Sequence, residues 1–190
     1  MNVNEILQVE TENMPYLKIR MLQKYQYAYL HCLRNLEYYY WAKNCSSIFR
    51  GYYLIMYIIW HTLWKHWSVK TGITIPKNVC EEGLTIYHWG SIVVNSEAHI
   101  GRNCCIMNNV NIGTNGGGDK APRIGHNVYI GPGAVLYGDI VIADGCYIGA
   151  NAVVNKSFTE PSSIIAGVPA KVIGHDEVLW WEKNRMQRNK

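Results

Sequence analysis

The chain has 190 residues, of which 48% are hydrophobic and 17% charged, and its formal net charge is +4 at pH 7. This composition excludes an intrinsically disordered chain and supplies enough apolar side chains for one compact domain, alone or with a helical appendage. The positive charge is mild, so a nucleic-acid partner is not expected.

Residues 1–72 are predicted to form an α-helical N-terminal region. Within residues 16–43, apolar side chains recur at steps of three and four, as along one face of a helix. They are Leu22, Tyr25, Tyr29, Cys32, Leu36 and Tyr39. Residues 51–64 carry no Asp, Glu, Lys or Arg. Such a segment is too short to cross a bilayer. It fits a helix packed on the rest of an oligomer, or alternatively a helix on a membrane surface through residues 51–67.

From about residue 73 to residue 174 the sequence becomes a six-residue repeat, whose first place is always aliphatic. The first places are Val94, Ile100, Ile106, Ile112, Ile124, Ile130, Leu136, Ile142, Ile148 and Val154. A short fixed period predicts a parallel β-solenoid. Three units would close one triangular coil, so that aliphatic side chains eighteen residues apart stack in a ladder. The second place is often Gly, Ala or Asn, which lets the chain turn a corner closely.

His88 and the segment 114–123 interrupt this pattern. Counting back six residues from Val94 leads to His88, where later repeats have Ile or Val. We interpret His88 as a functional residue where the first coil opens, and a histidine that only caps that coil is the alternative. Ile124 follows Ile112 by twelve positions instead of the six of the repeat. The insertion predicts a loop extruded at a corner, where it does not disturb the ladders.

The six cysteines are expected to be free thiols. The beginning of the chain has no charged region, apolar region and cleavage site of a secretory signal. Cys104 and Cys146 occupy small-residue places in the repeat. These features favour buried thiols in a reducing cytoplasm. A cytoplasmic location is therefore expected, with peripheral contact at the inner face of the membrane as the alternative.

The repeats and three motifs resemble a known family. The IGxxxx units, followed by IIAGVPAKVIG at 164–174, are similar to the left-handed β-helix acyltransferases. Within that superfamily, YHWGSIVVN at 87–95 and NIGTNGGGDKAPRIG at 111–125 resemble the serine acetyltransferase-like group. The resemblance implies a mainly β fold, a left-handed parallel β-helix at 73–174, with a helical tail at 175–190. It also implies an acetyl-CoA-dependent O-acetyltransferase that is a homotrimer, has active sites between subunits and needs no metal.

The site residues follow from the same resemblance. His88 matches the catalytic base, an assignment that agrees with the chemistry, because imidazole is the usual general base near neutral pH. Its second nitrogen would be held by a backbone carbonyl or by Glu81, Glu82 or Glu97. The expected acceptor-binding residues are Tyr87, Trp89, Asn108 and Asn109. The expected coenzyme-binding residues are Thr114, Gly116, Gly117, Lys120, Arg123, Ala150, Lys156, Gly167, Pro169 and Lys171.

Three departures from the serine acetyltransferase pattern bear on the acceptor. That group has an acidic residue immediately before the histidine and another fifteen positions before it, where this chain has Tyr87 and Ile73. It also has a histidine in the loop where this chain has Ala121. The expected acceptor is therefore a saccharide hydroxyl, as in the O-acetyltransferases of surface-polysaccharide synthesis. L-serine and a non-catalytic trimeric scaffold are the alternatives. A zinc hydratase is disfavoured, because His88, His99 and His126 lack the spacing of a metal site.

Overall fold

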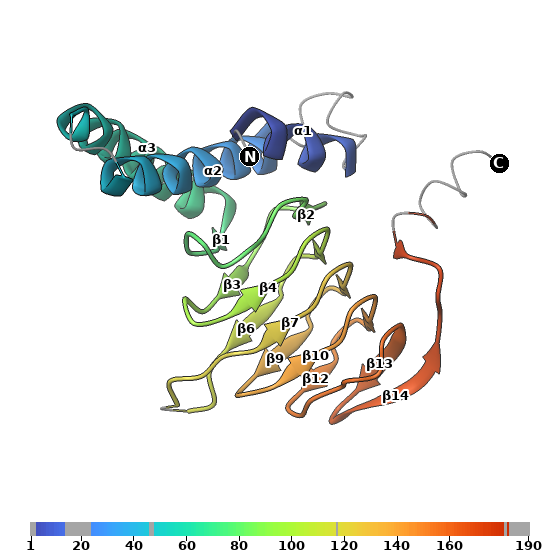
Figure 1. Ribbon diagram of the computed structural model, residues 1–190. Helices are drawn as coiled ribbons and strands as arrows, with labels where there is room; N and C mark the ends of the chain where they lie inside the picture. The colour runs from blue at the N-terminus through green and yellow to red at the C-terminus, as the bar shows by residue number, and fades with distance from the viewer. Residues whose placement is uncertain (1–2, 14–23, 46–47, 117, 181, 183–190) are drawn as a thin grey trace.

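The computed structural model describes residues 3–13, 24–45, 48–116, 118–180 and 182. The described helices are α1 (Val3–Asn13), α2 (Lys24–Cys45) and α3 (Arg50–Thr71). They lie across one end of a stack of β-coils, and the coils run from β1 beside the helices to the β13–β14 hairpin at the far end (Figure 1). The expected C-terminal helical tail lies largely outside the described residues.

Fourteen described strands form three sheets. Their bounds are β1 Ile73–Thr74, β2 Thr85–Ile86, β3 Ile92–Val94, β4 His99–Ile100, β5 Cys105–Ile106, β6 Asn111–Gly113, β7 Arg123–Ile124, β8 Tyr129–Ile130, β9 Val135–Tyr137, β10 Val141–Ile142, β11 Tyr147–Ile148, β12 Val153–Val154, β13 Ser163–Gly167 and β14 Ala170–His175. The orders are β1-β3-β6-β9-β12, β10-β7-β4 and β14-β13-β11-β8-β5-β2. All pairs are parallel except β13–β14. Successive strands visit the three sheets in turn, as in a triangular parallel β-helix.

The aliphatic ladder of the repeat forms the core of this prism. All ten first-place side chains are buried, with at most 3% of their surface exposed. In the six-stranded sheet, Ile106 pairs with Ile130 and Ile130 with Ile148. The predicted β-solenoid and the stacking of aliphatic side chains are therefore confirmed.

The prediction that His88 takes a ladder place is wrong. The ladder residue of the first coil is Ile86, which is fully buried and pairs with Ile106. Val94 follows Ile86 by eight positions, two more than the six of the repeat, so the turn after β2 is enlarged. His88 lies in that enlarged turn and is exposed.

Two places of the repeat explain how the coils turn and stack. The fourth place is repeatedly Asn or Gly with a positive φ, as at Asn109 (59°) and Asn151 (56°), a conformation that most residues adopt only with strain. The glycine in the second place has another role. A Cβ at Gly131 would come within 2.8 Å of the Ile148 oxygen on the next coil. The small second residue is thus needed because adjacent coils approach closely.

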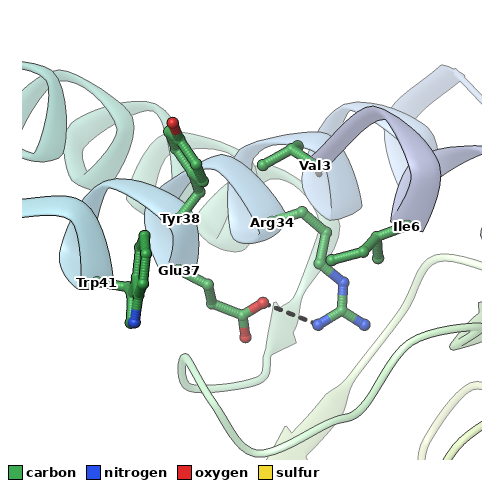
Figure 2. Close-up of a pocket in the computed structure, with 6 residues that line it drawn as sticks. All are labelled: Val3, Ile6, Arg34, Glu37, Tyr38 and Trp41. Atoms are coloured by element: carbon green, nitrogen blue, oxygen red, sulfur yellow. Dashed lines mark hydrogen bonds and ion pairs between the residues drawn. The ribbon is translucent and has the colours of Figure 1, made fainter. Parts of the chain in front are cut away.

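Buried polar contacts join α2 to the first coil. The Tyr29 hydroxyl donates to the Ile75 carbonyl (3.1 Å) and accepts from the Ile75 amide (2.8 Å) and from Trp64 Nε1 (3.2 Å). Arg34 forms an ion pair with Glu37 (2.8 Å) and donates to the carbonyls of Cys80 and Glu81. Figure 2 shows Arg34 and Glu37 in a cavity of about 240 Å³ that is also lined by residues of α1. The charged groups of this cavity therefore hold the helices on the prism.

The helices differ in detail from the prediction. Tyr29, Cys32 and Leu36 are buried on α2 as expected, whereas Tyr25 is 37% exposed. The helix predicted at 51–64 extends over Arg50–Thr71, and α1 had no counterpart in the sequence analysis. On α3 many large apolar side chains are exposed, namely Tyr52, Leu54, Ile55, Ile58, Ile59, Leu63 and Val69. No described helix is long and apolar enough to span a membrane.

The cysteines and the C-terminal segment complete the core. All six cysteines are free and all but Cys45 are buried. Burial raises the pKa of Cys104 to about 12 and that of Cys32 to about 11, so these thiols are poor nucleophiles.

Trp180 is only 3% exposed, and its indole nitrogen donates to the Asn103 carbonyl at 3.0 Å. The segment around Trp180 therefore packs against the prism.

Candidate functional site

The enlarged turn after β2 presents His88 and Trp89 at the surface. Both side chains are exposed, and Trp89 retains 56% of its surface. The turn is fixed at its end, because the Gly90 amide donates to the Thr71 carbonyl at the end of α3 (3.0 Å). Among the described residues, none forms a hydrogen bond or ion pair with the His88 ring.

Other predicted site residues lie on the same edge of the prism as His88. We call this edge, formed by residues 87–91, 107–110, 131–134 and 149–152, the His88 edge. Its turns are stacked by backbone hydrogen bonds from Gly133 to Asn108 (3.0 Å) and from Asn151 to Pro132 (2.9 Å). Asn108 lies directly next to the His88 turn, because a Cβ at Gly90 would be 3.4 Å from the Asn108 Cβ. Ala150 is two coils further along.

The length of this edge suits an elongated ligand. Parallel strands are spaced by about 4.8 Å, so Ala150 lies roughly 14 Å along the prism axis from His88. A thioester carried on a long flexible arm can therefore reach His88 while the rest of the molecule lies against the last coils. Asn108, Asn109 and Ala150, which were expected to bind the acceptor or the coenzyme, thus lie on the same edge of the prism as His88.

A cavity adjoins the His88 turn, and the sequence analysis did not predict it. It has a volume of about 240 Å³ and is lined by Tyr25, Lys70, Thr71 and Trp89. The Lys70 ammonium lies 5.2 Å from the ring centroid of Tyr25 and 5.0 Å from that of Trp67. The cavity thus combines one cation with aromatic faces. The repeat carries no signal for it, because three of its residues come from the helices.

Tyr87 contributes to packing. Its ring meets Trp180 edge-on, with centroids 6.3 Å apart, and its carbonyl accepts a hydrogen bond from the buried Gln26 side chain (3.1 Å). Tyr87 and Trp89, both expected to bind the acceptor, therefore have different surroundings. Trp89 lines the cavity, and Tyr87 anchors the turn to α2 and to the C-terminal segment.

The extruded loop leaves the prism at another edge, between β6 and β7 (Figure 1). Thr114 and Gly116 begin it, and Gly117 lies outside the described residues. Lys120 Nζ is 2.9 Å and Arg123 Nη2 3.3 Å from the carboxylate oxygens of Asp139. The Lys120 hydrogen bond, together with the charges of Lys120 and Arg123, lowers the pKa of Asp139. Asp139 therefore compensates part of the positive charge of Lys120 and Arg123, the two cations that were expected to bind the coenzyme.

The last coils bring two predicted coenzyme lysines together. Lys156 and Lys171 both line a cavity of about 330 Å³. Glu160 also lines it, so the two lysines are only partly balanced by one carboxylate. Gly167 (φ 100°) and Pro169 form the turn between β13 and β14, and Gly167 is exposed. This end of the prism can accept an anionic group.

The carboxylates that we expected to hold His88 lie elsewhere. Glu81 is 3.3 Å from His99 Nε2 and 3.5 Å from Arg102, and Glu82 also faces Arg102 (3.7 Å). These residues occupy the third edge of the prism, so this part of the prediction is wrong for Glu81 and Glu82. At the same edge, His126 Nδ1 accepts a hydrogen bond from the Arg102 amide (2.9 Å) and lies 3.7 Å from Glu81 Oε2.

Comparisons with known proteins agree with this fold. The family model "Bacterial transferase hexapeptide (six repeats)" matches residues 121–156. Serine acetyltransferase of Mycobacterium tuberculosis is 38% identical over 112 residues, which cover 57% of this chain and 48% of that protein. The chain thus spans about half the length of this relative.

Solved structures extend the likeness over most of the chain. The crystal structure of serine acetyltransferase from Brucella abortus superposes with a TM-score of 0.69 at 22% identity, covering 90% of this chain and 69% of that one. The same enzyme in complex with coenzyme A gives a TM-score of 0.67 at 25% identity, with coverage of 90% and 68%. The chain is therefore a left-handed parallel β-helix of hexapeptide repeats with an α-helical N-terminal region, as predicted.

Proposed function

We propose that this protein is an acetyl-CoA-dependent O-acetyltransferase with His88 as its general base. The observation that carries the proposal is the His88 edge, where an exposed imidazole lies at one end of a surface that continues to Ala150. The relatives support it, since they are named serine acetyltransferases and one related structure is a complex with coenzyme A. Lys156 and Lys171 would hold anionic groups of the coenzyme.

The proposed reaction is a direct transfer. The His88 imidazole takes the proton of an acceptor hydroxyl as its oxygen attacks the thioester carbonyl carbon. The tetrahedral intermediate then collapses, the carbon–sulfur bond breaks, and the imidazolium returns the proton to the leaving thiolate. Within the described residues the cysteine thiols other than Cys45 are buried, which disfavours a covalent acyl-enzyme on them.

L-serine is the first candidate acceptor, because the relatives named above carry serine in their names. None of the comparisons supports the saccharide that the sequence analysis favoured. One observation nevertheless keeps a saccharide as the second candidate. The positions that depart from the serine acetyltransferase pattern offer no carboxylate or imidazole to an amino acid: Ile73 is fully buried, Ala121 is 4% exposed, and the ring of Tyr87 packs on Trp180.

A coenzyme and acceptor assay tests the function. Calorimetric titration with acetyl-CoA should give saturable binding, and release of free thiol should then be followed with L-serine and with a panel of glycans. Saturable turnover with serine would establish the first candidate, and turnover with a glycan alone the second. A protein that fails to bind acetyl-CoA would instead be the non-catalytic scaffold.

We further propose that the active protein is a homotrimer. In one chain the His88 edge and the edge where the loop leaves the prism lie at opposite borders of the five-stranded sheet, so the loop leaves the prism away from His88. A neighbouring chain could bring its loop to His88. Light scattering should give a mass about three times 21.7 kDa. A fully active monomer at micromolar concentration would contradict this assembly.

Peripheral contact with a membrane through residues 51–67 has no support among the relatives. It stays a prediction that rests on the exposed apolar side chains of α3, such as Ile55 and Ile58. A neighbouring chain of the oligomer is the alternative cover for this face. Co-sedimentation with anionic lipid vesicles would distinguish the two.

A further inference from the structure

The cavity beside the His88 turn has the composition of a binding site for a small anion. Tyr25 and Trp89 are 37% and 56% exposed, so both rings are accessible. The volume of about 240 Å³ lies below the roughly 300–1,000 Å³ of sites for drug-sized ligands. An amino acid or a single sugar ring is of suitable size, whereas the coenzyme is too large. The cavity is thus suited to the acceptor.

Lys70 gives the cavity its charge. Its ammonium is held between the rings of Tyr25 and Trp67, which themselves meet edge-on at 5.8 Å. Among the described residues no carboxylate lies within ion-pairing distance of Lys70, whereas Lys120 is paired with Asp139. The aromatic contacts fix the ammonium, and no carboxylate of the described residues compensates its positive charge. The cavity therefore favours the carboxylate or phosphate group of a ligand.

The cavity is mechanically tied to the catalytic turn. Trp89 follows His88 in the chain, and the amide of Gly90 donates to the carbonyl of Thr71, a cavity residue. Gln26, next to Tyr25, binds the carbonyl of Tyr87 at 3.1 Å. Both flanks of His88 are thus attached to the two helices that line the cavity. The backbone of the turn that carries His88 is therefore fixed relative to the cavity.

We propose that Tyr25, Lys70 and Trp89 form the acceptor subsite, and that it selects a hydroxyl compound carrying a carboxylate or phosphate group. The inference rests on the proposed O-acetyltransferase function and adds the charge of its acceptor. Lys70 binds the anionic group, and the Tyr25 and Trp89 rings pack against the carbon skeleton. The carboxylate of serine and that of an acidic sugar share this chemistry.

Binding of two matched pairs of probes tests the subsite. L-serine is compared with L-serinamide, and D-glucuronate with D-glucose, so that each pair differs at the carboxylate. Calorimetry or ligand-observed NMR gives the affinities for the full-length protein. We expect the carboxylate of at least one pair to improve affinity about 10- to 100-fold, as for a charge-assisted hydrogen bond. The pair that shows this preference identifies the source of the anion.

The variants assign the preference to Lys70. Lys70→Met should abolish it and Lys70→Arg should restore it. Lys43→Met is the matched control, because Lys43 also lies over two rings, those of Tyr40 (5.0 Å) and Tyr57 (4.1 Å), but does not line this cavity. That variant should keep the preference. Equal affinities within both pairs, no binding of any probe, or a preference that survives Lys70→Met would overturn the subsite.

The subsite and the proposed function can fail separately. Binding of a carboxylate probe in a Lys70-dependent manner without any thiol release from acetyl-CoA would retain the subsite and contradict the enzyme. Turnover whose KM for the acceptor is unchanged in Lys70→Met would retain the enzyme and overturn the subsite. The KM for acetyl-CoA should stay constant in all three variants, because the lysines proposed for the coenzyme lie at the other end of the prism.

Discussion

Replacing His88 by alanine should lower acetyl transfer about 10²- to 10⁴-fold, the usual cost of removing a general base. The imidazole is exposed and lies outside the aliphatic ladder, so its loss leaves the core intact. Acetyl-CoA should still bind, and the oligomer should persist. Steady-state kinetics, calorimetry and light scattering measure these three properties.

His99→Ala is the matched control for this experiment. His99 is also an exposed histidine of the prism, but it lies at the third edge, 3.3 Å from Glu81. Its replacement should leave turnover near the wild-type value. If His88→Ala instead retains more than about a third of wild-type turnover, the base lies elsewhere, because that loss is far below the range of a general base.

Removing the Tyr29 hydroxyl should destabilise the protein by about 2–4 kcal/mol, since buried polar groups that lose their partner cost about 1–3 kcal/mol each. Tyr29→Phe leaves the Ile75 amide and carbonyl and the Trp64 indole nitrogen without this partner. The site is fully buried, and burial also raises the pKa of the Tyr29 hydroxyl well above its usual value. The hydroxyl therefore stays protonated as a donor.

Urea denaturation at matched protein concentration measures this loss. Tyr27→Phe is the control, because Tyr27 lies on the same helix and is 40% exposed. Surface substitutions of this kind usually change stability by no more than about 0.5 kcal/mol. Equal stability of the two variants would mean that the hydrogen bonds of the Tyr29 hydroxyl do not contribute to holding the helices on the prism.

The His88 turn illustrates how far the sequence reached. His88 interrupts the repeat, but counting back six positions from Val94 wrongly places it in the ladder. Counting forward from Ile86 gives eight residues instead of six, and Ile86 pairs with Ile106. The spacing was therefore present in the sequence. Only the strand register decided which of the two residues points into the core.

The acceptor cavity illustrates what the sequence did not reveal. Tyr25 and Lys70 are 45 residues apart and lie on two helices with no repeat to align them. Their proximity follows from the packing of α2 on α3 and from the contacts of Tyr29 and Arg34 with the first coil. The path of the first coil explains why Glu81 does not reach His88: strand β2 separates the two residues, and Glu81 faces His99 and Arg102 at another edge.

The sequence by itself determined the β-helix, its ladders and the corner at which the loop leaves. A six-residue period makes each coil repeat the one before, so local spacing fixes long-range neighbours such as Ile130 and Ile148. The helical region has no such period. Its position on the prism, and with it the cavity beside His88, was decided by tertiary contacts between side chains far apart in the chain, which no local pattern encodes.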